Sequence, residues 1–108
     1  MKEKIRKIMV LCDTEEEYAQ LMTEFKNLPW ELRTYTNVQD MLTMEKQEIE
    51  MLVVSESAYG PELQSLCPKR FVILNESGVM KWENLFYVDK YQEAEEIMKQ
   101  LLGIYTDA

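Results

Sequence analysis

Four short runs dominated by apolar residues constrain the fold of this chain more than any other feature. They cover residues 8–12, 49–54, 70–74 and 85–88. Such runs are typical of strands that are covered on both faces, as in parallel sheets with crossover helices on either side. Residues 30–36 instead alternate between apolar and polar side chains, which predicts one more strand, the second in chain order, at an edge of the sheet.

The first two connections between these strands carry helix start signals. Thr14 and Glu17 have the spacing of a capping box, and the helix that they begin is expected to stop before Pro29. Asn37 can cap a second helix that continues to about residue 47. The chain therefore begins as strand, helix, strand, helix, strand.

The later connections are shorter until the end of the chain. Residues 61–66 can form a short helix with proline in its first turn, and residues 79–84 leave room for little more than one helical turn. A long apolar stripe over residues 91–102 predicts the last helix, with Gly103 as its expected C-cap.

This element order predicts an α/β fold. Five strands that alternate with helical crossovers favour a doubly wound, flavodoxin-like parallel sheet of order 2-1-3-4-5, with shortened third and fourth helices. A chain of 108 residues falls in the size range of one domain, so we expect residues 1–108 to form a single domain.

Charge and residue content disfavour several functions. The 20 acidic and 12 basic residues give a net charge of -8, which repels nucleic-acid backbones and anionic membranes, so a protein partner is the better expectation. The chain has no histidine, which removes the commonest general base and zinc ligand. Neither a secretory signal nor an apolar segment of transmembrane length is present, and we expect a cytoplasmic domain with two reduced cysteines.

Candidate site residues follow the predicted strands. Ligands of doubly wound sheets bind beyond the carboxyl ends of the strands, near the switch in strand order. In this chain that edge is expected to hold Cys12, Asp13, Ser55, Asn75 and Lys90. The sequence contains no glycine-rich phosphate loop and no paired-cysteine metal motif, so these five residues are the ones to consider.

With these residues, the chain resembles a response-regulator receiver domain from about residue 7 to about residue 102. In that family two acids after the first strand hold magnesium, and an aspartate after the third strand accepts a phosphoryl group. A threonine or serine closes the fourth strand, and a lysine follows the fifth. The resemblance places the acid pair on Cys12 and Asp13, the acceptor on Ser55 and the hydroxyl on Asn75. The lysine falls on Lys90, so only Asp13 and Lys90 match.

These departures predict that the phosphorylation chemistry is lost. Magnesium prefers hard oxygen ligands, and a carboxylate with a thiol and a hydroxyl is a poor set. The Ser55 hydroxyl is a weak nucleophile without a base. We therefore expect no metal, no cofactor and no enzymatic activity. A shift of one residue at the end of the third strand would instead put Glu56 at the acceptor position, as an acid of a different length.

Each site residue also has a purely structural interpretation. Asp13 can be a turn or cap residue before the first helix, and Lys90 can be a solvated side chain. Cys12 can be a small buried apolar group. Ser55 and Asn75 can be loop residues that satisfy nearby backbone groups.

Aromatic residues around the fifth strand are candidates for protein contact. An exposed Trp82 would be an interface anchor on the side that receivers use for partners, and Tyr87 and Tyr91 are further candidates. The alternative is that Trp82 covers the core. Most of the eight methionines are expected in the core, with Met44 and Met80 as the ones that can reach the surface.

These observations predict a pseudo-receiver, a non-phosphorylated regulatory domain that docks on a protein partner or on a second copy of itself. Residues 91–97, Tyr-Gln-Glu-Ala-Glu-Glu-Ile, are also similar to the closing helix of degenerate receivers that precede ParA/MinD-type ATPases in Flp/Tad pilus-assembly proteins. That similarity implies an attached C-terminal ATPase domain. Residues 104–108 end abruptly, as at a domain edge, so we expect the chain to be a piece of a longer protein.

Two other functions stay open. The first is a phosphorylatable receiver of a two-component system, with Asp13 or Glu56 in an unorthodox role. The second is an enzyme that uses Cys12 as a nucleophile. The acids near Cys12 are expected to raise the pKa of its thiol, which opposes that use.

Overall fold

The computed structural model describes residues 8–13, 31–43 and 49–106. The predicted helix that begins at Thr14, the end of the predicted second helix and the side chains of Trp30 and Met44 lie outside the described residues.

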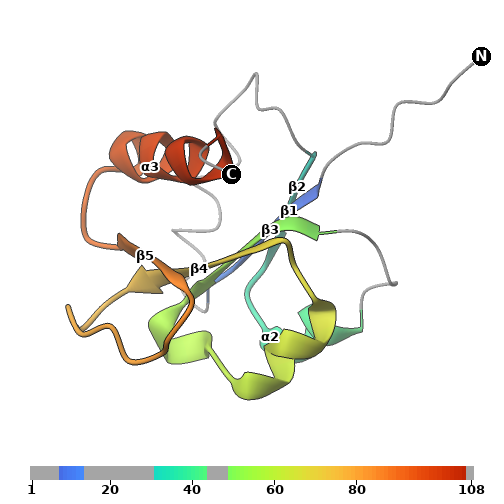
Figure 1. Cartoon of the computed structure of the whole chain (residues 1–108). Helices are drawn as coiled ribbons and strands as arrows, with labels where there is room; N and C mark the ends of the chain where they lie inside the picture. Colours follow the sequence, from blue (N-terminus) through green and yellow to red (C-terminus); the bar gives the residue numbers. More distant parts are fainter. Residues whose placement is uncertain (1–7, 14–30, 44–48, 107–108) are drawn as a thin grey trace, which may run out of the picture.

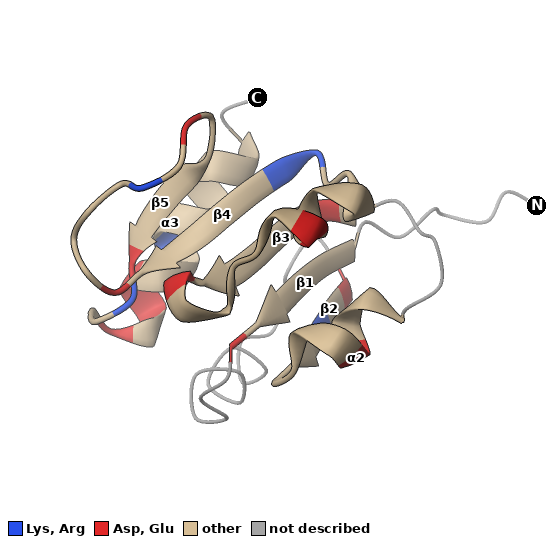
Figure 2. Cartoon of the chain, turned by 90° about the horizontal axis from the view of Figure 1, so that it is seen from below, with Lys and Arg blue, Asp and Glu red and all other residues tan. Residues whose placement is uncertain are grey.

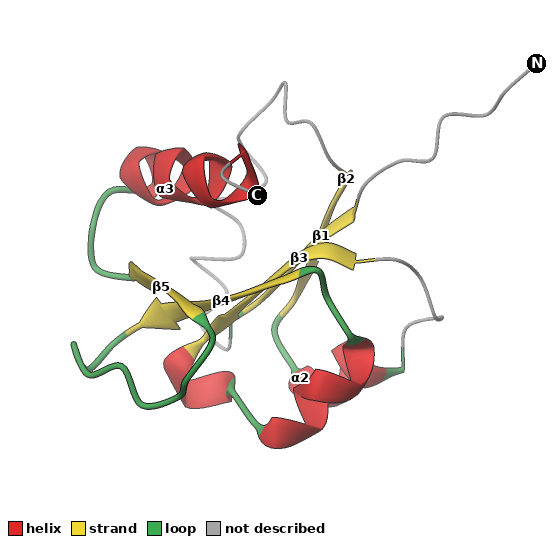
Figure 3. Ribbon diagram, in the orientation of Figure 1, coloured by secondary structure: helices red, strands yellow, loops and turns green. Residues whose placement is uncertain are grey.

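The centre of the molecule is a five-stranded parallel sheet (Figures 1 and 3). Its strand order is β2-β1-β3-β4-β5, so the predicted 2-1-3-4-5 arrangement is confirmed. The strands are β1 (Ile8–Cys12), β2 (Glu31–Tyr35), β3 (Ile49–Ser55), β4 (Arg70–Asn75) and β5 (Phe86–Asp89).

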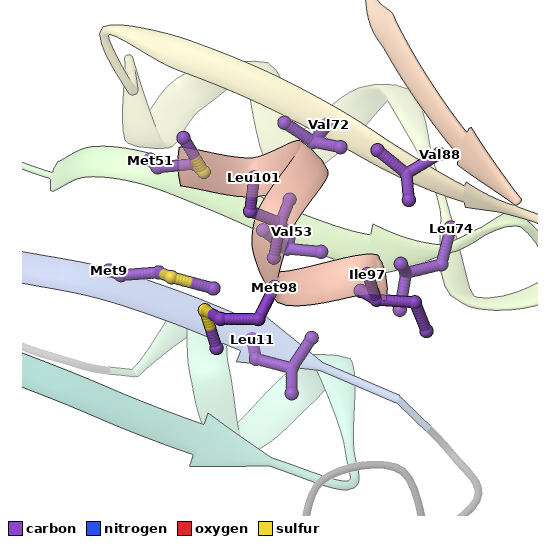
Figure 4. Packing of buried hydrophobic residues seen from close by; sticks show 10 residues of the cluster. All are labelled: Met9, Leu11, Met51, Val53, Val72, Leu74, Val88, Ile97, Met98 and Leu101. Carbon is purple, nitrogen blue, oxygen red and sulfur yellow. The ribbon is translucent and has the colours of Figure 1, made fainter. Parts of the chain in front are cut away.

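Both faces of the sheet are covered, as the apolar runs predict. Alternate residues of a strand point to opposite faces, so Met9 and Leu11 face one apolar cluster while Val10 and Cys12 face another. The helix α3 (Ala94–Thr106) covers the first cluster through Ile97, Met98 and Leu101, which Figure 4 shows together with its strand residues.

The opposite face is covered by shorter elements. These are α2 (Val38–Leu42) and two 3-10 helices, η1 (Glu56–Ala58) and η2 (Pro61–Leu66). Figure 3 shows all three on the side of the sheet away from α3. The predicted N-cap is confirmed, because the Asn37 side chain accepts a hydrogen bond of 2.7 Å from the Gln39 N–H.

The predicted turn of helix before β5 is wrong. Residues 76–85 contain only bends and turns, so the fourth helix is absent rather than short. Gly78 and Asn84 have φ angles of 80° and 64°, in the left-handed region that interrupts a right-handed helix. The Asn75 and Glu56 side chains also bind backbone N–H groups of this segment.

The predicted C-cap at Gly103 is also wrong. The last helix continues through Gly103 to Thr106. Gly103 is exposed, and a Cβ placed on it would meet no atom within 4 Å. Its neighbours Ile104 and Tyr105 pack against the core beneath α3, and this packing explains why the helix extends beyond the glycine.

Candidate functional site

The carboxyl ends of β1, β3, β4 and β5 lie at one edge of the sheet. Cys12 is level with Val54, Ser55 with Leu74, and Asn75 with Asp89. This register brings the residues that follow the strands, including Asp13 and Lys90, to the same edge. Figure 2 shows acidic segments (red) gathered near the arrowhead of β4.

Lys90 is the centre of this edge. Its side chain is fully buried, and its Nζ lies 3.2 Å from Asp13 Oδ1 and 2.9 Å from Glu76 Oε2. The interpretation of Lys90 as a solvated side chain is therefore wrong. Burial by itself would lower the pKa of Lys90, but the hydrogen bonds and charges of Glu76 and Asp13 raise it well above its usual range.

Asp13 is fully buried and contacts both the end of β2 and Lys90. Its N–H donates a hydrogen bond of 3.0 Å to the Tyr35 carbonyl at the end of β2. β1 and β5 are separated by β3 and β4, so the contact between Asp13 and Lys90 lies over the ends of those two strands. The predicted cap role of Asp13 concerns a helix outside the described residues.

Ser55 and Cys12 are buried at the same edge. The Ser55 side chain is fully buried, and within the described part of the chain its hydroxyl has no hydrogen-bond partner. Cys12 is also fully buried and belongs to the apolar cluster opposite α3, as its structural interpretation predicts. Burial first and the Asp13 carboxylate second raise the pKa of the Cys12 thiol to about 11, which opposes a role as a nucleophile.

Asn75 organises the segment after β4. Its side-chain nitrogen donates a hydrogen bond of 3.1 Å to the Val79 carbonyl, and its side-chain oxygen accepts one from the Gly78 N–H. The side chain thus closes a turn, as its structural interpretation predicts.

From the sequence, Glu56 is a candidate only as a substitute phosphate acceptor. Its Oε1 accepts hydrogen bonds of 2.9 Å from the N–H groups of Glu76 and Ser77, and Lys81 Nζ lies 2.7 Å from its Oε2. The bond from Lys81 first, and the two backbone N–H groups next, lower the pKa of Glu56 to about 2. Its carboxylate therefore holds the segment after β4.

Glu76 is the site residue that sequence reasoning missed. Its Oε1 accepts a hydrogen bond of 2.7 Å from the Ser57 N–H, and its Oε2 binds Lys90. Burial alone would raise the pKa of Glu76, but the bonds from Lys90 and Ser57 outweigh it and lower the pKa. Glu76 lies 14 residues from Lys90, and no local pattern joins them.

The side chains at this edge do not fit the magnesium ion of an active receiver. Asp13 already binds the Lys90 ammonium, Cys12 is a buried thiol of raised pKa, and Ser55 offers a neutral hydroxyl. In residues 8–13, 31–43 and 49–106, no three side chains of His, Cys, Asp or Glu are grouped so that they could hold a metal ion.

The three interface candidates differ in exposure. Trp82 is half-buried on the cluster opposite α3, with its ring centroid 4.3 Å from that of Tyr59. The Tyr87 hydroxyl accepts a hydrogen bond of 2.7 Å from the Trp82 N–H, so Trp82 covers the core and Tyr87 fixes it there. Tyr91 is 62% exposed.

Two hollows flank β5. One, of about 470 Å³, is lined by Glu76, Met80, Tyr87, Asp89 and Tyr91, among others. The other, of about 390 Å³, lies between β5 and α3 and is lined by Phe86, Tyr87, Gly103 and Ile104, among others. We call the four side chains Met80, Phe86, Tyr87 and Tyr91 the β5 surface.

Comparison with solved structures identifies the fold. The signal receiver domain of an HD domain-containing protein from Pseudomonas fluorescens Pf-5 superposes with a TM-score of 0.69 at 15% identity, over 96% of this chain and 100% of that chain. The chain therefore has a receiver-like, flavodoxin-like fold. No family model matches the sequence, and no curated protein does either.

In the described part of the chain, no helix has both the length and the apolar character that are needed to cross a membrane.

Proposed function

We propose that this domain is a pseudo-receiver: a regulatory docking domain of the cytoplasm that takes no phosphoryl group and catalyses no reaction. The observation that carries the proposal is the charge balance at the strand ends. Lys90, which would meet a phosphorylated acid, is buried against Asp13 and Glu76, while the end of β3 offers the neutral Ser55.

The test uses a small acyl-phosphate donor with magnesium. The intact mass of the domain should not change, because Ser55 offers no carboxylate, the Glu56 carboxylate is already bound by Lys81 and two backbone N–H groups, and the strand ends hold no fitting metal site among the described residues. A genuine receiver domain treated in parallel serves as the positive control. A gain of one phosphoryl group would favour the second candidate, a phosphorylatable receiver, for which the buried pair of Asp13 and Lys90 is the supporting observation.

Docking is the function that such a domain keeps, and the β5 surface is the supporting feature. Met80 and Tyr91, 75% and 62% exposed, line one of the two hollows that flank β5, and Phe86, 46% exposed, lines the other; exposed large apolar side chains beside hollows are characteristic of interaction sites. β5 is also an edge strand that pairs only with β4 among the described strands, so its outer backbone groups can pair with another chain.

We propose that the partner is a protein segment that carries basic and apolar side chains. The only exposed lysines among residues 79–100 are Lys81 and Lys99, and each lies within 4 Å of a carboxylate. A second copy of the chain, with a net charge of -8, would bring the same acidic rim against itself. The exposed acids of this stretch are Glu83, Asp89, Glu93, Glu95 and Glu96.

The docking proposal can be tested by selection of random peptides on the domain. Peptides that bind the native domain but not the Phe86→Ser/Tyr91→Ser variant should be rich in Lys and Arg, and their affinity should fall as salt is raised. Glu62→Ser, an exposed change on η2, is the control variant. Neutral or acidic selected peptides would contradict the proposal, and so would self-association that the double variant abolishes.

The attached ATPase is a finer proposal. It rests on the similarity of residues 91–97, of which Ala94 to Ile97 form the first turn of α3. The coding sequence after Ala108 tests it: a nucleotide-binding phosphate loop downstream would support an ATPase, and a DNA-binding domain would contradict it.

A further inference from the structure

A buried ammonium at the end of a parallel sheet needs negative charge from nearby groups, because an unpaired buried charge is strongly disfavoured. In the family that the fold resembles, this charge would come from the strand ends. Here Ser55, the last residue of β3, supplies none, since its buried hydroxyl is neutral and has no hydrogen-bond partner among the described residues. Glu76, in the loop after β4, binds Lys90 at 2.9 Å instead.

We propose that Glu76 is the resident anion of this site. Its carboxylate takes the place beside Lys90 that an acid at position 55 would fill, and thereby holds the segment from Glu76 to Lys90 in one state. The inference rests on the proposed function, since a residue that accepted phosphate at this edge would compete with Glu76 for Lys90.

The contacts of Glu76 fit this role. One carboxylate oxygen binds the Ser57 N–H in η1 and the other binds Lys90 after β5, so the side chain joins the ends of β3, β4 and β5. Its own N–H binds the Glu56 carboxylate at 2.9 Å, which fixes the backbone from which the side chain extends. These bonds define a site for a carboxylate, and the chain fills it with its own side chain.

The site is also open to solvent. The Glu76 side chain is 18% exposed and lines the hollow of about 470 Å³ that Met80 and Tyr91 border. A small carboxylate such as formate can therefore reach Lys90 when the Glu76 side chain is removed. The same hollow joins the site to the β5 surface, so the position of Glu76 bears on the shape of the docking surface.

A double-mutant cycle at positions 55 and 76 tests the exchange of anions. Glu76→Gln removes one charge from Lys90, and Ser55→Asp adds a carboxylate to the two that bind Lys90 among the described residues, so each variant alone should unfold more readily. The double variant has the same number of carboxylates at this edge as the wild-type protein. Its unfolding equilibrium constant should be about tenfold smaller than the value obtained by adding the free-energy effects of the two single variants. Glu83→Gln, an exposed change in the same segment, is the control and should show no coupling with Ser55→Asp.

Chemical rescue gives an independent result if Ser55→Asp fails to fold. Sodium formate should raise the unfolding midpoint of Glu76→Ala, and the midpoint should rise further with formate concentration, as for a ligand that binds only the folded state. Sodium chloride at the same ionic strength should not have this effect. The wild-type protein should not respond to formate. Additive effects in the cycle together with no formate response would overturn the inference. Neither result depends on phosphoryl transfer, so a failure here is distinguishable from a failure of the proposed function.

Discussion

Replacing Lys90 by methionine should be among the most damaging single changes in this domain. The change keeps the length and apolar stem of the side chain but leaves Asp13 and Glu76 without the ammonium that both bind. Asp13 is fully buried and the Glu76 side chain is 18% exposed, so water can compensate only the second carboxylate. Breaking a buried ion pair costs about 3–5 kcal/mol. Small domains are stable by about 5–15 kcal/mol, so this is a large share.

The assay is equilibrium unfolding in urea, with Lys99→Met as the matched control. Lys99 and Glu96 also form an ion pair, at 3.6 Å, but their side chains are 74% and 50% exposed. Surface pairs contribute about 0–1 kcal/mol, so the control should lose little. The prediction fails if the two variants lose similar amounts of free energy, because Lys90 would then contribute no more than an exposed lysine.

The pH dependence of the Lys90→Met variant provides a second check. Without the ammonium, Glu76 loses the hydrogen bond and the charge of Lys90 that help to lower its pKa, so the stability of the variant depends less on the ionised form of Glu76. In the wild-type protein the Glu76 pKa is lowered, and its contribution is lost as pH falls below the ordinary value of 4.5. The deficit of the variant should therefore shrink on acidification. A deficit that is constant with pH would refute the electrostatic explanation.

Three further predictions concern other residues. Gly103→Ala should raise the free energy of unfolding by about 1 kcal/mol and the melting temperature by about 4 °C, because Gly103 is exposed inside a helix; a left-handed cap would reverse the sign. Glu56→Gln should be less stable than wild type above about pH 5, and the gap should close as pH falls from 4.5 toward about 2, since the Glu56 pKa is lowered over that range. Iodoacetamide at neutral pH should modify the exposed Cys67 and spare Cys12 until the chain unfolds, as peptide mass spectrometry can show.

The parts of the fold that could be predicted from sequence are those with local causes. The strands begin and end within one residue of the predicted ones, because an apolar run bounded by turn residues is a local pattern. The cap at Asn37 is local in the same sense. Gly103 shows the limit, since a glycine near the end of an apolar stripe is compatible with a cap or with a further helical turn. Contacts of Ile104 and Tyr105 with the core determine the outcome.

The site divides in the same way. The sequence predicted which residues stand at the strand ends, but it could not reveal the burial of Lys90, since a lysine is buried only when carboxylates from distant segments surround it. Among the described residues, such carboxylates come from positions 13 and 76, at separations of 77 and 14 residues. The roles of Glu56 and Glu76 depend on contacts across the sheet edge, which periodicity does not encode.

Ser55 and Glu76 are therefore best understood together. Ser55, at the end of β3, brings no negative charge to Lys90, so the ammonium needs an acid from another segment. Among the described residues Glu76 is such an acid, with its Oε2 at 2.9 Å from Lys90 Nζ. With an aspartate at position 55, Glu76 would add like charge to the same edge and would be disfavoured there. Under the proposed function the two positions are linked through one ammonium, so the neutral residue at position 55 and the internal anion at position 76 are two parts of a single electrostatic arrangement.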